Sequence, residues 1–214
     1  MKSLLPTALQ SAWDVQDTVT RRARLCELAF AGYQIPRCGE FSEMRRLGVP
    51  LVVYRDERAH CGQGKVLWRP GEAVDWPPSA FCSQYVPDSD GFENNYEHEG
   101  STQKTSLWVS RRELWVGRWM VELKYTSRVS WMANVGGEYE VVVGPTPSEM
   151  RYRELIRYPM FAVDYTRVGD DWTSHDYHFD LNVCPHVPVE VVNAVGRETL
   201  RASIEDFCKS RGLL

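Results

Sequence analysis

Three oxygen-bearing side chains in the last third of the sequence have the types and spacing of a metal site. Asp164 interrupts an apolar run, and Asp180 and Asn182 lie two residues apart in another. Side chains two apart on a strand share a face, so a neighbouring strand carrying Asp164 would complete an oxygen-only cluster. Such a cluster suits Mg²⁺, which takes its other ligands from water and phosphate. Strand-edge aspartates facing water are the alternative, but Asp is disfavoured inside strands, which favours the metal site.

Histidines and cysteines give a weaker signal. His175 and His178 lie three residues apart, and His60 precedes Cys61. Imidazole and thiolate groups suit zinc, and Cys61 or Cys184 beside a histidine could act as a nucleophile. Because the six cysteines are scattered without a CxxC pair, we expect them to be reduced thiols. At the histidines, we expect an ordinary surface turn.

The elements that must position the aspartates are mostly strands. An amphipathic helix is expected to begin at Asp17 or Thr18 and to end near Ala31, with Gly32 as its left-handed cap. Strands are expected at 49–55, 65–68, 80–86, 105–110, 113–125, 129–134, 139–143, 160–167 and 178–183. We further expect a loop over 88–102, a turn at 111–112, and helices at 148–157 and about 196–210. This order predicts an α+β fold with antiparallel sheets.

Composition excludes several classes of protein. The 214 residues are 43% hydrophobic and 25% charged, which is typical of one globular domain or two small lobes. A net charge of -4 argues against nucleic acid as a partner. The sequence has neither the apolar run of about 20 residues that a membrane span needs nor a secretion signal at its start. We therefore predict a cytoplasmic protein with no membrane partner.

The order of the motifs resembles the ATP-grasp family. Asp164, a hairpin turn and then Asp180-Leu181-Asn182-Val183-Cys184-Pro185 are similar to the magnesium motif of that family. Upstream, 31–36 resembles the opening of its domain, 48–53 its apolar strand, 61–65 its glycine-rich lid and 83–87 its adenine hinge. The resemblance runs from about Asp17 to the C-terminus, and its specificity lies in the order of the pieces.

The resemblance implies an ATP-grasp-like protein with Mg-ATP between an N-terminal lobe, 15–87, and a C-terminal lobe, 88–214. Asp164, Asp180 and Asn182 would hold Mg²⁺ between the phosphates. The other implied site residues are Gln84, Tyr85 and Val86 for adenine, Arg55, Gly62, Gly64 and Lys65 for phosphates, and Lys124 and Arg128 for the transferring group. Each assignment has a purely structural alternative. Gly62 and Gly64 would form a simple hairpin turn, Pro87 would end a strand, and Lys124 and Arg128 would lie on a solvent-exposed sheet face.

The implied activity is that of an ATP-dependent ligase. It would activate a small-molecule carboxylate as an acyl phosphate, which an amine or another nucleophile then attacks; direct phosphorylation of a hydroxyl would use the same nucleotide site. The alternative is a catalytically inactive nucleotide-binding, structural or regulatory protein.

Three departures from the family motivate that alternative. Tyr54 stands where the family usually has a lysine, and Ala162 and Val163 occupy the places before the first metal aspartate where an arginine often lies. Only sixteen residues precede Asp17, so the usual preceding domain is missing. Either a homodimer or a partner subunit supplies it, the C-terminal lobe does all of the work, or the protein no longer catalyses a reaction.

Overall fold

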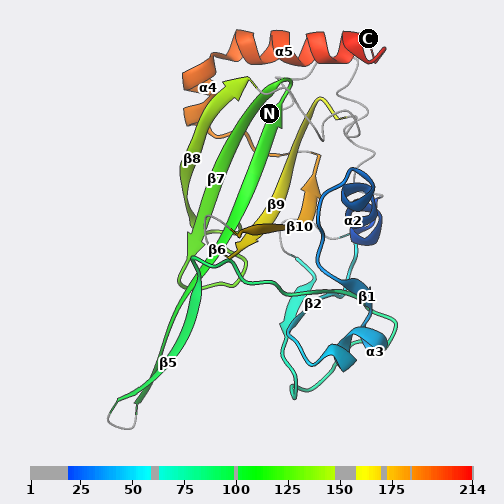
Figure 1. The fold of residues 1–214 in the computed structure, drawn as a ribbon, viewed down its shortest axis with the longest axis vertical. Coiled ribbons are helices and arrows are strands. Elements are labelled where there is room, and N and C mark those ends of the chain that lie inside the picture. The colour runs from blue at the N-terminus through cyan, green and yellow to red at the C-terminus, as the bar shows by residue number, and fades with distance from the viewer. Residues whose placement is uncertain are drawn as a thin grey trace.

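Two antiparallel sheets with packed helices make up the protein (Figure 1). The computed structural model describes residues 19–58, 63–98, 101–147, 158–169, 173–183 and 185–213. Within these ranges one sheet has four strands and the other has six. The predicted α+β class with antiparallel sheets is confirmed.

The smaller sheet comes from the N-terminal part of the chain. Its strands lie in the order β1 (Cys38–Glu40), β4 (Phe81–Gln84), β2 (Leu51–Tyr54) and β3 (Lys65–Trp68). All four residues of β2 are buried, as expected for an apolar strand with neighbours on both sides. The short helix α3 (Phe41–Met44), which continues as the 3₁₀ helix η3 (Arg45–Leu47), covers one face.

Helix α2 (Arg21–Phe30) joins the two sheets. Thr20 is its N-cap and accepts a hydrogen bond from the N–H of Ala23, so the helix begins later than the predicted Asp17 or Thr18. The end near Ala31 is confirmed, and Gly32 has the predicted positive φ of 89°. Apolar residues of α2 share one core with both sheets: Leu25, Leu28, Tyr54, Phe81, Phe161, Val163 and Leu181.

The larger sheet holds most of the strands. Its path is β10 (His175–Asn182), β9 (Met160–Val168), β6 (Ser101–Val116), β7 (Trp119–Ser127) and β8 (Glu138–Pro147), and β5 (Phe92–His98) also pairs with β6. Strand β9 therefore lies between its hairpin partner β10 and the distant β6. The expected loop over 88–102 is wrong for 92–98, which form β5, and for 101–102, which begin β6.

Two further predictions about this sheet are wrong. The chain does not turn at Arg111 and Arg112; β6 runs through both, and the turn follows at Gly117. Gly117 has a φ of 57°, and a Cβ there would lie 2.2 Å from Oγ of Ser203, which explains why glycine is required. The expected strand at 129–134 is absent from the described chain, which forms turns there.

Helices α4 (Val189–Val195) and α5 (Arg197–Ser210) cover one end and face of the larger sheet (Figure 1). Leu200 and Ile204 of α5 pack against Leu114 and Ala162. The predicted C-terminal helix is confirmed as α5, whereas α4 was not expected. The helix expected at 148–157 lies outside the described residues. In the described ranges, no helix combines the length and apolar character needed to cross a membrane.

Candidate functional site

A cleft lies between the two sheets, beside the segment that follows β4. Four predicted residues line it: Lys65, Gln84, Tyr85 and Val86. Its closed part has a volume of about 50 Å³. The Tyr85 ring meets the Trp131 ring edge to face, with centroids 6.0 Å apart, so an aromatic contact links the two lobes across the cleft. Burial, helped by the charge of Glu93, raises the pKa of Tyr85 to about 12, so its phenol stays protonated at neutral pH.

Two buried hydroxyls on the floor of the cleft have no hydrogen-bond partner. Ser110 and Thr166 are each 5% exposed, and the described residues offer their Oγ atoms neither donor nor acceptor. They occupy the positions next to the last β6–β9 pair, Arg111 with Tyr165, and both line the cleft. Because an unpaired buried hydroxyl costs about 1–3 kcal/mol, this pair is the kind of feature that a bound polar ligand would satisfy.

Asp164 lies behind Asn134, which lines the cleft, and both of its carboxylate oxygens accept hydrogen bonds. It is 2% exposed. Arg112 donates from Nε to Oδ1 at 2.6 Å and from Nη2 to Oδ2 at 3.0 Å, and Asn134 donates from Nδ2 to Oδ2 at 2.7 Å. Burial alone would lower the pKa of Arg112, but the carboxylate of Asp164 and the phenol of Tyr125 outweigh it and raise that pKa.

Asp180 faces Asp164 from the neighbouring strand, as predicted. The two residues are direct partners in the β9–β10 ladder, just past an irregularity between His178 and Asp180. Asp180 forms ion pairs with Arg21 through Oδ1 and with Lys65 through Oδ2, the latter at 3.5 Å. Both carboxylates therefore have cationic partners from elements far away in the sequence.

Tyr54 forms part of the wall beneath these cations. Its ring centroid lies 5.8 Å from Cζ of Arg21 and 5.9 Å from Nζ of Lys65, and its hydroxyl is 3.2 Å from Oγ of Ser83. Burial raises the pKa of Tyr54 and lowers that of Arg21. The position where the family usually has a lysine is thus filled by a buried, neutral aromatic residue.

The predicted metal ligands come together, but their surroundings do not fit Mg²⁺. Asn182 opposes Ala162 in the ladder and shares a face with Asp180. Three cations, Arg21, Lys65 and Arg112, contact the two carboxylates. A divalent ion would add two positive charges beside these three cations in a buried site.

Four other predicted residues do not line the cleft: Arg55, Gly64, Lys124 and Arg128. Arg55 points away from it and donates to Asp75 at 2.5 and 2.6 Å, because regular β2 pairing puts Tyr54 on the cleft side. Lys124 is paired with Arg111, whereas Asp164 is paired with Arg112, so strand alternation places Lys124 on the opposite face.

Lys124 there donates to Asp90 at 2.6 Å. Arg128 follows the end of β7 and is exposed. Gly62 lies outside the described residues. Gly64 has a φ of 66°, and its carbonyl accepts a hydrogen bond from the N–H of Arg55 at 2.7 Å, as in the hairpin-turn alternative.

Sequence reasoning missed five residues of this site: Arg21, Ser110, Arg112, Asn134 and Thr166. Arg112 was assigned to a turn, and its pairing with Asp164 joins residues 52 apart in the chain. The one available signal was the occurrence of two adjacent arginines inside a long run of strand-forming residues.

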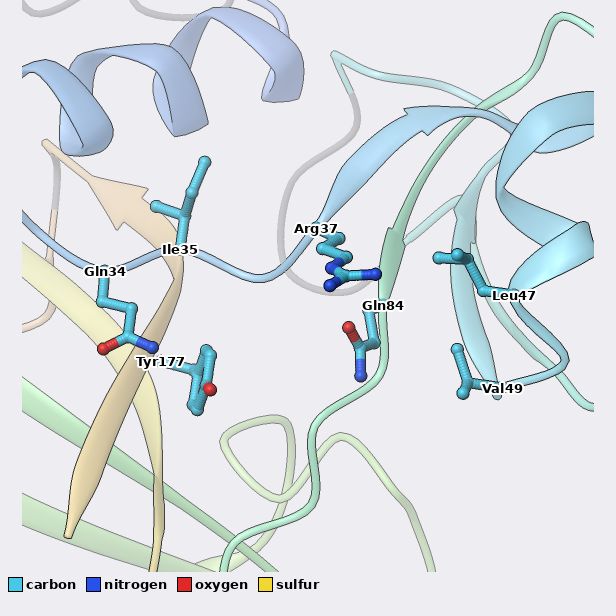
Figure 2. Close-up of a pocket in the computed structure, with 7 residues that line it drawn as sticks. All are labelled: Gln34, Ile35, Arg37, Leu47, Val49, Gln84 and Tyr177. Carbon is cyan, nitrogen blue, oxygen red and sulfur yellow. The ribbon is translucent and has the colours of Figure 1, made fainter. Parts of the chain in front are cut away.

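A second and larger cavity adjoins the cleft. It has a volume of about 550 Å³, and Figure 2 shows Gln84 between Tyr177 on one side and Val49 on the other. Gln34 and Arg37, from the segment that links α2 to β1, also line it. Gln84 lines both cavities, so the two spaces adjoin at this residue.

No protein-family profile matches the sequence, and no curated protein matches it. Among solved structures, the chain is similar to the ATP-grasp ligase PsnB complexed with minimal precursor, Mg and ADP. The identity is 14% and the TM-score 0.48, and the match covers 87% of this chain and 59% of that one.

Two further solved structures are similar. One is D-alanine–D-alanine ligase from Bacillus anthracis complexed with ATP, with 15% identity, a TM-score of 0.47, and coverage of 90% of this chain and 67% of that one. The other is a RiPP-associated ATP-grasp ligase from Chryseobacterium gregarium, with 12% identity, a TM-score of 0.46, and coverage of 94% and 62%. This chain spans 59% to 67% of the length of these three proteins.

Proposed function

We propose that this protein binds an adenine nucleotide, ATP or ADP, in the cleft between its two sheets. The observation that carries the proposal is the pair of buried hydroxyls, Ser110 and Thr166, which line the cleft without a partner. Buried polar groups are nearly always hydrogen-bonded in folded proteins, so two orphans in one cleft indicate a missing polar ligand.

The cleft has the two kinds of lining that a nucleotide requires. Apolar side chains, among them Val52, Met132 and Phe179, line it together with residues 84–86, and would hold a flat base. Lys65, which contacts Asp180, also lines the cleft and would attract phosphate oxygens.

Binding requires the cleft to widen. Its closed part, about 50 Å³, is smaller than the roughly 300 Å³ at which ligand pockets begin. The rings of Tyr85 and Trp131, which are in contact, would have to move apart for the cleft to widen. Residues 86–87 follow β4 without strand pairing and are suited to bend as a hinge, whereas the N–H of Tyr85 still donates to the carbonyl of Pro50 at 2.9 Å.

Between the two activities considered from the sequence, the geometry favours nucleotide binding without chemistry. Carboxylate activation in the ATP-grasp manner would use Mg²⁺ held by Asp164, Asp180 and Asn182, and cations already pair with both carboxylates. Neither Lys124 nor Arg128 lines the cleft to stabilise a transferring phosphoryl group. The ligase therefore ranks second, with its substrates, a homodimer or partner subunit, and the cytoplasmic location remaining predictions.

Isothermal titration calorimetry tests the proposal. Purified protein is titrated with ATP, ADP and, as a control for the base, GTP. We expect ATP and ADP to bind with micromolar to sub-millimolar affinity, to alter tryptophan fluorescence through Trp131, and to release no ADP in mixtures of carboxylates and amines. A Trp131→Phe variant identifies the part of the fluorescence change that comes from the cleft. Absence of binding at millimolar ATP would refute the proposal, and ADP release would restore the ligase.

A further inference from the structure

We infer that this cleft binds the phosphates of its nucleotide without a divalent metal ion, because side-chain cations of the chain already occupy both carboxylates of the predicted metal site. The inference rests on the proposed nucleotide site for its ligand. It concerns the position where the ATP-grasp resemblance implies Mg²⁺. There, the side chains of Arg21, Lys65 and Arg112 would provide the positive charge that the ion would otherwise supply.

The first step concerns the lone pairs of Asp164. A carboxylate binds Mg²⁺ through an oxygen lone pair. Arg112 donates a hydrogen bond to one lone pair on each oxygen of Asp164, and Asn134 donates to the second lone pair of Oδ2. Two-pronged pairing of arginine with a carboxylate is among the stronger interactions of its kind, and this one is almost fully buried. These three hydrogen bonds use three of the four lone pairs of the carboxylate. The remaining one, on Oδ1, would place Mg²⁺ directly beside the buried Arg112 guanidinium, where the two positive charges repel.

The second step concerns Asp180. Arg21 and Lys65 contact different oxygens of this carboxylate, and the three side chains are 8%, 11% and 13% exposed for Arg21, Lys65 and Asp180. Arg21 is fixed at the first position of α2, where Thr20 caps the helix, so it is not a free surface side chain. Asp180 is therefore held from two sides by cations on separate elements.

The third step concerns the phosphates. Three cations surround the two carboxylates, and Lys65 lines the cleft as well as contacting Asp180. A phosphate group brought against Lys65 would add a negative charge beside these cations. A magnesium–phosphate complex would bring its own two positive charges toward Arg21, Lys65 and Arg112. Electrostatics thus favours the metal-free nucleotide.

The main experiment compares nucleotide binding by the unaltered protein with and without metal. ADP and ATP are titrated by calorimetry in buffer with excess EDTA and again in millimolar Mg²⁺. We expect Kd values that agree within about twofold, whereas a site built around the metal would bind about tenfold or more tightly with Mg²⁺. Binding that needs Mg²⁺ would overturn the inference and leave the proposed nucleotide site intact.

A second readout does not depend on the nucleotide. Electron paramagnetic resonance follows free Mn²⁺ as it is titrated into the unaltered protein and into Arg112→Gln. We expect Mn²⁺ to stay free with the unaltered protein and to bind once Arg112→Gln exposes the carboxylate of Asp164.

Arg111→Gln is the matched control for this titration. Arg111 is the next residue of the same strand, is equally buried, and pairs with Asp88 and Asp90 on the opposite face. In this variant Lys124 still pairs with Asp90, and the N–H groups of Asp90 and Arg167 still donate to Asp88, so we expect no Mn²⁺ binding. Stoichiometric Mn²⁺ binding by the unaltered protein that is lost in Asp164→Asn would overturn the inference, even if no nucleotide bound under either condition. If Arg112→Gln did not fold, the nucleotide and Mn²⁺ titrations of the unaltered protein would still show whether the site binds a metal ion.

Discussion

Arg112 and Asp164 are cross-strand partners in β6 and β9, and the guanidinium donates to both carboxylate oxygens, at 2.6 and 3.0 Å. Each residue is the other's main counter-charge in a buried setting. Removing one member of a buried ion pair destabilises a protein strongly, because the other charge is left buried without a partner; replacing both members can be nearly neutral.

Removing only Arg112 should therefore destabilise the protein strongly. We expect Arg112→Leu to lower the free energy of unfolding by about 3–5 kcal/mol, because Asp164 becomes a buried, partly uncompensated carboxylate. Urea unfolding monitored by circular dichroism measures this. In Arg112→Leu/Asp164→Leu, which removes both charges, we expect most of the loss to be recovered. A single variant that is no less stable than the original would contradict the importance of the pair.

The unpartnered hydroxyl of Thr166 predicts opposite effects on stability and binding. Thr166→Val keeps the shape of the side chain and removes the orphan group, so the free energy of unfolding should rise by about 1 kcal/mol. Affinity for ATP should fall by about fivefold, because the ligand loses a hydrogen bond. Thermal unfolding and calorimetry measure the two changes.

Serines provide a matched comparison for this test. Ser110→Ala should behave like Thr166→Val. Ser203 is equally buried, but its Oγ accepts a hydrogen bond from the N–H of Arg118 at 2.9 Å. Ser203→Ala should therefore lower stability by about 1 kcal/mol and leave ATP affinity unchanged. If Thr166→Val and Ser110→Ala were also destabilising, the hydroxyls would not be unsatisfied in the free protein.

Lys65 should contribute directly to phosphate binding. We expect Lys65→Met to weaken ATP and ADP binding about tenfold or more, because the cleft loses a cation that lines it. Titration calorimetry measures the affinities. Lys209→Met removes a lysine from the last turn of α5, outside the cleft, and should leave them unchanged. Equal affinities for the two variants would remove Lys65 from the site.

His178 should make stability depend on pH. Burial lowers its pKa, although the carbonyl of Gln34, 3.1 Å from Nδ1, and the charge of Asp176 act in the opposite direction. Below the usual histidine pKa of about 6.5, the unfolded chain binds a proton that the folded protein resists, so stability falls as pH falls through that region.

The pH effect can be assigned to one histidine by comparing variants. The free energy of unfolding, measured in urea between pH 7.5 and 5.5, should fall less in His178→Gln than in the original protein. His186 is exposed, and His186→Gln should retain the full decline. An unchanged decline in His178→Gln would show that other groups cause it.

The sequence was most informative where structure is local. Strand periodicity and a hairpin turn sufficed to place Asp164 opposite Asp180, because both depend on residues within one hairpin. Helix α5 and the end of α2 were likewise found from spacing and the cap at Gly32.

Non-local pairing explains most of the errors. Arg111 and Arg112 were expected in a turn, since adjacent charges are unusual inside a sheet. Asp88 and Asp164 neutralise them from distant segments, so the strand continues through both. The face on which Lys124 lies was equally hidden, because it depends on the register between β6 and β7. No single-strand pattern contains that information.

The core that α2 shares with both sheets has a mechanical consequence. Leu25 and Leu28 of the helix pack in one cluster with Tyr54 of the small sheet and Phe161 of the large one. Neither sheet can melt without exposing apolar surface that belongs to the other, so the chain should unfold as one cooperative unit with a single transition. The same core restricts how the cleft can open. The two sheets can move apart at the cleft only by a rotation that keeps both of them packed against α2.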